Sequence, residues 1–456
     1  MVGSNRFDPF SALGTGAGGI SQGPCSRTAP RGSDERRAVI LSVSALLLGI
    51  SVLLVGSGLL GTLLGVRAAL ESFPAVVIGP VMSAYFLGFV VGTYLCPPVI
   101  RRVGHIRAFA AMAGLAAASA FAHVLYVSPW AWGFLRAVTG VCQVGLYMVV
   151  ESWLNERAPA ESRGRVFAVY IASILAAGAL GQALVPVDGA AGALGFGLAA
   201  VLFALGLVPV ALTDLAEPVP VTAQRAGLGR LVRASPLGVV GTLVSGLANS
   251  AFWGMGAVFA LRVGMSTGEI AAFMAATISG GAVLQWPIGY LSDRFERRAV
   301  LIAVCLAGAG VALGLRAAVD VSHPVLLAGA FAYGGLAFSV YSLSVAHLND
   351  HLAPGEVLEA TRGLLLVYGV GATLGPSVAG LLMGAFGPGS LLLYFAAAYG
   401  ALGLFALLRA QMRPPVPAED QRPFVPLARM SPVGLELNLT PQGGDEAAEA
   451  APGPAG

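Results

Sequence analysis

The chain has 456 residues, of which 26 are basic and 23 acidic, so that only 11% are charged, while 56% are apolar and the mean hydropathy is +0.80. Soluble proteins have about a quarter of their residues charged. These charges are too few to cover the several water-soluble domains that a chain of this length would otherwise form. We therefore interpret the chain as an integral membrane protein with several spans.

Apolar stretches of about 20 residues, the length of a helix that crosses the hydrocarbon core, recur along the chain. We predict an all-α membrane protein with twelve transmembrane helices. The predicted spans are 38–62, 76–98, 106–127, 131–154, 166–186, 191–212, 238–260, 269–290, 299–319, 324–347, 363–385 and 390–408.

Polar stretches separate these spans into larger units. Residues 214–236 are predicted to be a cytoplasmic linker between two pseudo-symmetric six-helix halves, 38–213 and 237–409. Residues 1–37 and 410–456 are rich in glycine, proline and scattered charge, and we predict that both are disordered cytoplasmic tails because they cannot bury enough apolar surface.

The arginines fall mostly in alternate connections between the spans. Because arginine-rich connections stay on the cytoplasmic side of a membrane, this distribution places the N- and C-termini in the cytoplasm. We predict a multi-pass protein of the bacterial inner (plasma) membrane.

Residue types that carry common chemistry are missing or scattered. Every basic residue is an arginine, which excludes a Schiff-base lysine and a P-loop lysine. The cysteines Cys25, Cys96, Cys142 and Cys305 stand alone, without metal-ligand spacing. We expect no metal site, no cofactor and no enzyme activity, because no nucleophile pair or carboxylate dyad is present either.

The fourth and tenth predicted spans share residues at one offset of 194 positions. The arginine-glycine pairs at Arg163 and Arg362, after the fourth span and before the eleventh, match as well. A duplicated six-helix unit is typical of carriers whose binding site lies between the halves near the bilayer midplane. The repeated residues are Gly140, Tyr147 and Leu154 in the fourth span and Gly334, Tyr341 and Leu348 in the tenth.

The connection after the eighth span contains Gly289, Asp293, Arg294 and the pair Arg297 and Arg298. This pattern resembles the loop signature of the major facilitator superfamily, and the resemblance extends over all twelve spans. It implies a transporter fold with two six-helix halves.

The first half shows the same resemblance with one departure. Arg101 and Arg102 match the paired basic residues, but Cys96 or Pro97 stands where the family has an aspartate.

Two elements of the fourth span and its end add to the resemblance. Arg136 with Gly140 is similar to an element of proton-coupled members, and Glu156 with Arg163 to an element that follows the fourth span in many members. The stretch from Tyr147 to Arg157 most resembles the bacterial YcaD-like branch.

The charged residues of these connections are predicted to form a cytoplasmic gate between the halves. Exposed ion pairs contribute about 0–1 kcal/mol each, so such a gate biases an equilibrium without locking it. An equally compatible interpretation is that the arginines only fix the topology. The gate candidates are Arg101, Arg102, Glu156, Arg163, Asp293, Arg294, Arg297, Arg298 and Arg362.

Five residues of the fourth span, spaced four, three, four and four apart, share one helical face. We expect this face to line a central cavity, because an arginine that faces lipid costs about 2.5 kcal/mol or more. The residues are Arg136, Gly140, Gln143, Tyr147 and Glu151.

Other groups extend the candidate site. Glu151 is the one carboxylate that we place inside a span, so coupling to protons would use Glu151, use a histidine such as His123 or His347, or not occur. Asn249, Trp253 and Tyr341 are the candidates on the seventh and tenth spans, where polar and aromatic side chains either line a pore or bond across helix contacts. Trp253, Gln285 and Trp286 together either offer a flat ring surface to a substrate, or the two tryptophans anchor the helix ends at the membrane interface. Carboxylates are scarce in the spans, whereas four arginines make the outer half of the pore mildly positive, which favours an anionic or neutral amphipathic substrate. These are Arg67, Arg136, Arg262 and Arg316.

These observations predict a secondary active transporter of a small molecule that works by alternating access between two six-helix halves. One alternative is an efflux carrier of drug-like amphipaths, and another, from a different class, is a membrane sensor or receptor that transports nothing. The expected partners are a small-molecule substrate, the lipid bilayer and protons as coupling ion. We expect no nucleic-acid partner and a monomeric carrier.

Overall fold

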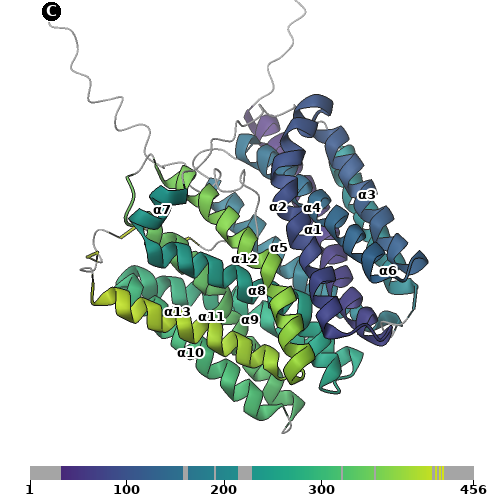
Figure 1. The fold of residues 1–456 in the computed structure, drawn as a ribbon. Coiled ribbons are helices and arrows are strands. Elements are labelled where there is room, and N and C mark those ends of the chain that lie inside the picture. Colours follow the sequence, from purple (N-terminus) through teal and green to yellow (C-terminus); the bar gives the residue numbers. More distant parts are fainter. Residues whose placement is uncertain are drawn as a thin grey trace, which may run out of the picture. The chain divides into compact units, whose positions relative to one another are not determined.

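The computed structural model describes residues 32–157, 163–188, 192–213, 228–319, 322–353, 356–412, 416–417, 421–422 and 424–425. These residues are almost entirely helical and include no β-strand (Figure 1). Twelve of the helices are long and apolar enough to cross a membrane. The predictions of an all-α chain and of twelve spans are confirmed. Residues 39–456 form one compact unit.

The twelve spans occur in helices whose bounds follow in chain order. They are α1 (Gly32–Leu70), α2 (Ala75–Val103), α3 (His105–Leu125), α4 (Pro129–Arg157), α5 (Arg163–Ala183), α6 (Leu194–Ala211), α8 (Pro236–Arg262), α9 (Thr267–Arg294), α10 (Arg297–Ala318), α11 (His323–Asn349), α12 (Val357–Phe386) and α13 (Ser390–Ala410). Two short helices are η2 (Val185–Asp188) and α7 (Leu228–Ala234).

Helix starts and ends follow local chemistry. The Ser266 hydroxyl accepts a hydrogen bond from the Glu269 N–H at 3.4 Å while the Glu269 carboxylate accepts one from the Ser266 N–H at 2.8 Å, which is a capping box at the start of α9. Gly104, with a φ of 86°, separates α2 from α3.

Several predicted boundaries differ from the structure. α1 begins at Gly32 and continues to Leu70 rather than ending at residue 62, because the apolar sequence continues past that point. The predicted linker 214–236 contains α7 and the first residue of α8, and its residues 214–227 lie outside the described part of the chain. Of the predicted tail 1–37, residues 32–37 belong to α1 and residues 1–31 lie outside the described part of the chain.

Glycines allow α2 and α4 to cross in backbone contact. A Cβ atom on Gly88 would lie 2.0 Å from the carbonyl oxygen of Ala137, and one on Gly140 would lie 2.0 Å from the carbonyl oxygen of Tyr85. Real Cβ atoms do not approach other atoms this closely, so only glycine fits at either position.

The same crossing occurs between α9 and α11. A Cβ atom on Gly280 would lie 1.8 Å from the Phe331 carbonyl oxygen, and one on Gly334 would lie 1.9 Å from that of Thr277. Gly334 is the residue that repeats Gly140. The sequence repeat therefore corresponds to the same kind of helix crossing, α2 with α4 in the first half and α9 with α11 in the last half.

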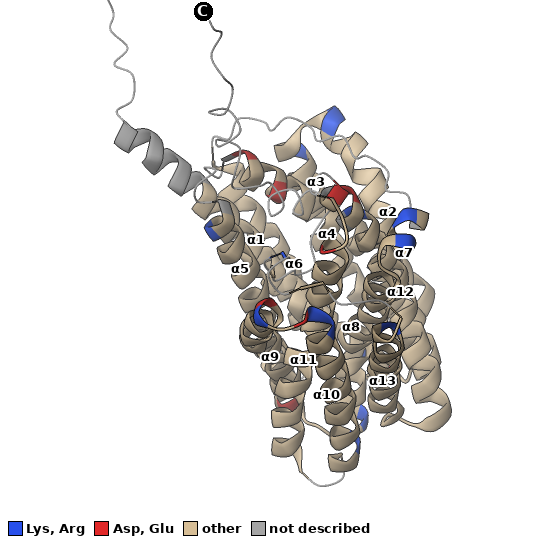
Figure 2. Ribbon diagram, turned by 90° about the vertical axis from the view of Figure 1, so that its left-hand side faces the viewer, with Lys and Arg blue, Asp and Glu red and all other residues tan. Residues whose placement is uncertain are grey.

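We call the end of the spans that includes Arg294 and Arg297 the arginine-rich end, and the end that includes Leu70 and Ala75 the opposite end. Figure 2 shows charged residues at the ends of the helices and few along the spans. This distribution is the one expected of helices that cross hydrocarbon.

The first six spans contact the last six toward the opposite end. Ser83 on α2 and Ser377 on α12 share a hydrogen bond of 2.8 Å between their hydroxyls. A Cβ atom on Gly254 of α8 would lie 3.0 Å from side-chain atoms of both Met82 and Pro376. We call these five residues the seal.

Candidate functional site

A central cavity of about 150 Å³ lies between the spans, on the arginine-rich side of the seal. Eight helices contribute to it, namely α1, α2, α4 and α5 from the first six spans and α8, α9, α11 and α12 from the last six. The lining residues used below are Tyr85, Phe86, Arg136, Tyr147, Asn249, Trp253, Gln285, Phe338, Tyr341 and Tyr368.

Arg136 is the one charged side chain among the described residues that line this cavity. It is 7% exposed, and its guanidinium carbon lies 4.5 Å from the centre of the Tyr85 ring on α2. This is cation–π geometry, which strengthens when the groups are removed from water. The guanidinium thus lies against an aromatic face, inside a cavity whose walls are otherwise uncharged.

Aromatic rings form the facing wall. Trp253 of α8 stacks on Phe338 of α11, with centroids 6.3 Å apart and planes within 6°. Tyr341 of α11 meets Tyr368 of α12 edge to face at 5.0 Å. Such arrangements stabilise the rings against one another and leave planar apolar surface for a bound ligand.

Two amides in the wall are oriented by hydrogen bonds to neighbouring helices. The Gln285 amide nitrogen donates to the Ser342 hydroxyl at 2.9 Å. The Tyr399 hydroxyl donates to the amide oxygen of Asn249 at 3.4 Å. Because these bonds fix the amides, they can present defined donors and acceptors to a ligand.

Only some of the five residues on the predicted face of α4 line the cavity. Arg136 and Tyr147 line the cavity, and Gly140 lies at the crossing with α2. Gln143 is buried, and neither atom of its amide group has a hydrogen-bond partner among the described residues. Glu151 lies one turn beyond Tyr147 toward the arginine-rich end.

The Glu151 carboxylate is completely buried. It accepts a hydrogen bond of 2.8 Å from the Tyr170 hydroxyl of α5. The Glu151 side chain therefore does not line the cavity, although the lining residue Tyr147 is only one helical turn away on α4.

The gate candidates of the first six spans and of α12 differ in how exposed their side chains are. Arg101 and Arg102 are exposed at the end of α2, and Glu156 is exposed on α4. Arg362 is half-buried on α12, and the side chain of Arg163 lies outside the described part.

The last-half candidates lie around the connection between α9 and α10. Arg294 lies over the Tyr290 ring, with its guanidinium carbon 4.6 Å from the ring centre. Arg298 pairs with Glu296 at 2.7 Å. Asp293 pairs with Arg297 at 3.1 Å.

The main partner of Arg297 is Asp350, which sequence reasoning missed. One terminal nitrogen of Arg297 donates to both Asp350 carboxylate oxygens, at 2.6 and 2.7 Å, and both side chains are 1% exposed. The Arg297 Nε donates to the Ser292 hydroxyl at 3.2 Å. Burial raises the pKa of the Asp350 carboxyl above its usual value, while the Arg297 charge opposes that rise.

Sequence reasoning also missed most of the aromatic wall. Tyr85, Phe86, Phe338 and Tyr368 line the cavity, but an aromatic residue in an apolar span has the same appearance whether it faces lipid or a cavity. Trp286, the second tryptophan of the ring surface suggested by the sequence, is 76% exposed and does not line the cavity. The described residues contain no cluster of three His, Cys, Asp or Glu that could hold a metal ion.

The fold and cavity are those of a membrane transporter, and comparison with known proteins identifies the family. The model of the Major Facilitator Superfamily matches residues 238–441. A protein described as an uncharacterized MFS-type transporter, YcaD, from Escherichia coli O17:K52:H18 is 30% identical over 386 residues, which cover 84% of this chain and 98% of that protein. The chain belongs to the major facilitator superfamily of membrane transporters.

Solved structures share the fold. A point mutant of the nucleoside transporter NupG superimposes with a TM-score of 0.68 at 16% identity, over 81% of this chain and all of that one. A bacterial homologue of the human lysosomal transporter Spinster, in an inward-facing and occupied conformation, gives 0.68 at 15% identity over 83% of this chain and 97% of that one. At these identities the likeness concerns the fold alone.

Proposed function

We propose that this protein is a secondary active transporter of a small amphipathic organic anion that carries an aromatic ring. The observation that supports this substrate class is the composition of the central cavity, in which Arg136 is the one charged lining residue described and planar rings form the facing wall. A carboxylate can pair with the guanidinium while its ring packs on Trp253 or Tyr341. Sites of this kind combine an apolar lining with a few polar groups that fix orientation.

We propose that transport proceeds by alternating access between the halves 38–213 and 237–409. The seal closes the cavity toward the opposite end through contacts of α2 with α8 and α12. Rocking the halves about the cavity would open this seal while the arginine-rich end closes. The arginine distribution supports cytoplasmic termini and a bacterial inner membrane.

A ligand screen on the purified protein tests the substrate class. Three matched sets are compared by thermal shift: benzoate and indole-3-carboxylate, the corresponding amides, and the corresponding amines. The carboxylates are expected to stabilise the protein most, by about 1.4 kcal/mol at ten times their Kd, since ligand binding stabilises the folded state by mass action. Uptake of the tightest carboxylate into proteoliposomes then tests transport.

Two outcomes contradict the proposal. If the amines stabilise the protein more than the carboxylates, the cavity selects cations, as an efflux carrier of cationic drugs would. If the carboxylate binds but neither uptake nor exchange occurs, the protein is a sensor rather than a carrier.

Replacing Glu151 with glutamine is expected to abolish accumulation driven by an imposed pH gradient, while exchange of labelled for unlabelled substrate across the membrane persists. Glutamine cannot bind and release a proton, but it can keep a hydrogen bond to Tyr170. Gradient-driven uptake and exchange are measured in the same proteoliposomes.

Glu71→Gln is the control, because Glu71 is a partly exposed carboxylate that pairs with Arg67 and belongs neither to the cavity lining nor to the gate candidates. This variant should retain both activities. If Glu151→Gln keeps gradient-driven uptake with an unchanged pH dependence, Glu151 is not the coupling group.

A further inference from the structure

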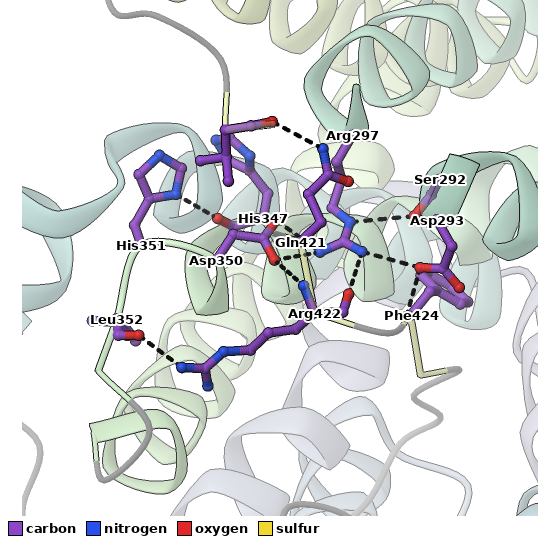
Figure 3. Close-up of polar contacts among 11 residues, drawn as sticks. Ser292, Asp293, Arg297, His347, Asp350, His351, Leu352, Gln421, Arg422 and Phe424 are labelled. Carbon is purple, nitrogen blue, oxygen red and sulfur yellow. Dashed lines mark hydrogen bonds and ion pairs between the residues drawn. The ribbon is translucent and has the colours of Figure 1, made fainter. Parts of the chain in front are cut away.

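Part of the C-terminal tail packs against the arginine-rich end of the last six spans. Gln421, Arg422, Phe424 and Val425 are described, and we call them the docked segment. The expectation of an unpacked tail over 410–456 does not hold for these four residues. Figure 3 shows the segment between the start of α10 and the end of α11.

Main-chain groups of the segment bond to charged side chains. The Arg422 N–H donates to the Asp350 carboxylate at 3.0 Å, and the Arg297 guanidinium donates to the Arg422 carbonyl oxygen at 2.6 Å. The Phe424 N–H donates to the Asp293 carboxylate at 2.8 Å. Hydrogen bonds to charged groups are stronger than neutral ones, so these contacts define one docked geometry (Figure 3).

Side chains complete the contact. The Arg422 guanidinium donates to the carbonyl oxygen of Leu352 at 2.8 Å, which ties the segment to the connection between α11 and α12. The Phe424 ring lies against Gly289 on α9, where a Cβ atom would be 2.3 Å from the ring. The ring therefore occupies space that exists only because residue 289 is glycine.

The docked segment uses groups that the predicted gate also needs. With Arg422 in place, the Arg297 guanidinium donates to Ser292, Asp293, Asp350 and the Arg422 carbonyl through all three of its nitrogens. The Asp293 oxygen that pairs with Arg297 also accepts from Phe424. Both gate candidates are thus engaged within the last six spans.

We propose that the docked segment is a tethered brake, which keeps Asp293 and Arg297 from pairing with the first six spans and so holds the carrier open at the arginine-rich end. Closing that end requires these groups to exchange partners, and the segment has to be released first. A segment that binds one state in preference to the other shifts the equilibrium by its differential affinity. This inference rests on the alternating access of the proposed function.

Gly289→Ala in the full-length chain tests the docking without altering the tail. The added methyl group displaces the Phe424 ring, so we expect amide hydrogen exchange at Arg422 and Phe424 to rise by about tenfold or more, as two bonded amides open. Gly310→Ala on α10 is the matched control, because nothing lies within 4 Å of its Cβ position. Phe424→Ala should reproduce the rise, and adding Gly289→Ala to it should have no further effect.

The effect on the carrier is measured by opening of the seal. Ser377→Cys is introduced into a chain whose four natural cysteines are replaced by alanine, and an impermeant maleimide is added from the opposite-end side. Gly289→Ala and Phe424→Ala should each raise the labelling rate roughly three- to tenfold over Gly310→Ala, since release of the brake populates the state open at that end.

Unchanged exchange at Arg422 and Phe424 in both Gly289→Ala and Phe424→Ala overturns the proposal, because the ring would not hold the segment. Raised exchange with equal labelling in the glycine variants also overturns it, since the segment would dock without affecting the equilibrium. If Ser377→Cys is labelled in no variant even when substrate is added, alternating access itself fails, which is a failure of the proposed function.

Discussion

Replacing Arg136 with alanine is expected to weaken binding of aromatic carboxylates at least tenfold and to abolish their uptake. The variant removes the one charged group among the described lining residues and leaves the aromatic wall intact. A charge-assisted hydrogen bond to a carboxylate contributes about 1.5–3 kcal/mol, which corresponds to a factor of ten or more. Titration of purified protein with benzoate or indole-3-carboxylate measures the loss.

Arg136→Lys should fall between alanine and the natural residue, because an ammonium keeps the charge but lacks the planar fork that stacks on Tyr85 and pairs with a carboxylate. Arg107→Ala, at an exposed position on α3, is the matched control and should bind normally. The neutral amides should lose little affinity in Arg136→Ala. Equal losses for carboxylates and amides would mean that Arg136 supports the cavity rather than contacts the charge.

Replacing Asp350 with alanine is expected to lower the free energy of unfolding by about 3–5 kcal/mol, because it leaves the Arg297 guanidinium buried without its main counter-charge. The variant also removes the acceptor of the Arg422 N–H. Equilibrium unfolding by sodium dodecyl sulfate in mixed micelles measures the change.

Glu296→Gln is the control for Asp350→Ala. The Glu296 carboxylate pairs with Arg298 at 2.7 Å but is 37% exposed, so its loss should cost about 0–1 kcal/mol. Adding Arg297→Met to Asp350→Ala should recover part of the stability, since it removes the uncompensated charge. A cost for Asp350→Ala no larger than that for Glu296→Gln would show that water reaches Arg297.

The spans were predictable because hydropathy reports directly on the cost of placing a helix in hydrocarbon. The repeat of Gly140 as Gly334 was visible in the sequence, but its cause was not, because a glycine in an apolar helix shows nothing about which backbone approaches it. The pairing of Arg297 with Asp350 joins residues 53 positions apart. Helical spacing on one element cannot reveal such a contact.

Arg136 and Tyr147 were identified as cavity candidates because a polar residue in a span needs a sheltered environment. Gln143 and Glu151 met the same criterion on the same face, yet they do not line the cavity. A helical face is shared between a cavity and neighbouring helices, and the division depends on how far α2 and α5 extend along it. How far these helices cover α4 is set only when the whole bundle has assembled.

The glycine crossings carry a mechanical consequence. On α1 and α5 a Cβ atom on Gly181 would lie 2.5 Å from the Val55 carbonyl oxygen, and on α8 and α12 one on Gly246 would lie 2.3 Å from that of Tyr368. Together with the α2–α4 and α9–α11 crossings, these contacts join helix pairs within each half by backbone-to-backbone packing. If one helix of a pair slid along the other, carbonyl oxygens would clash with main-chain atoms. We therefore expect the two helices of each pair to move together as a rigid body. Across the halves, α2 and α12 approach in the same way, since a Cβ atom on Gly79 would lie 2.5 Å from the Pro376 carbonyl oxygen and one on Gly380 would lie 2.5 Å from that of Ala75. Opening of the seal therefore has to separate main-chain surfaces as well as the two hydroxyls and the methionine.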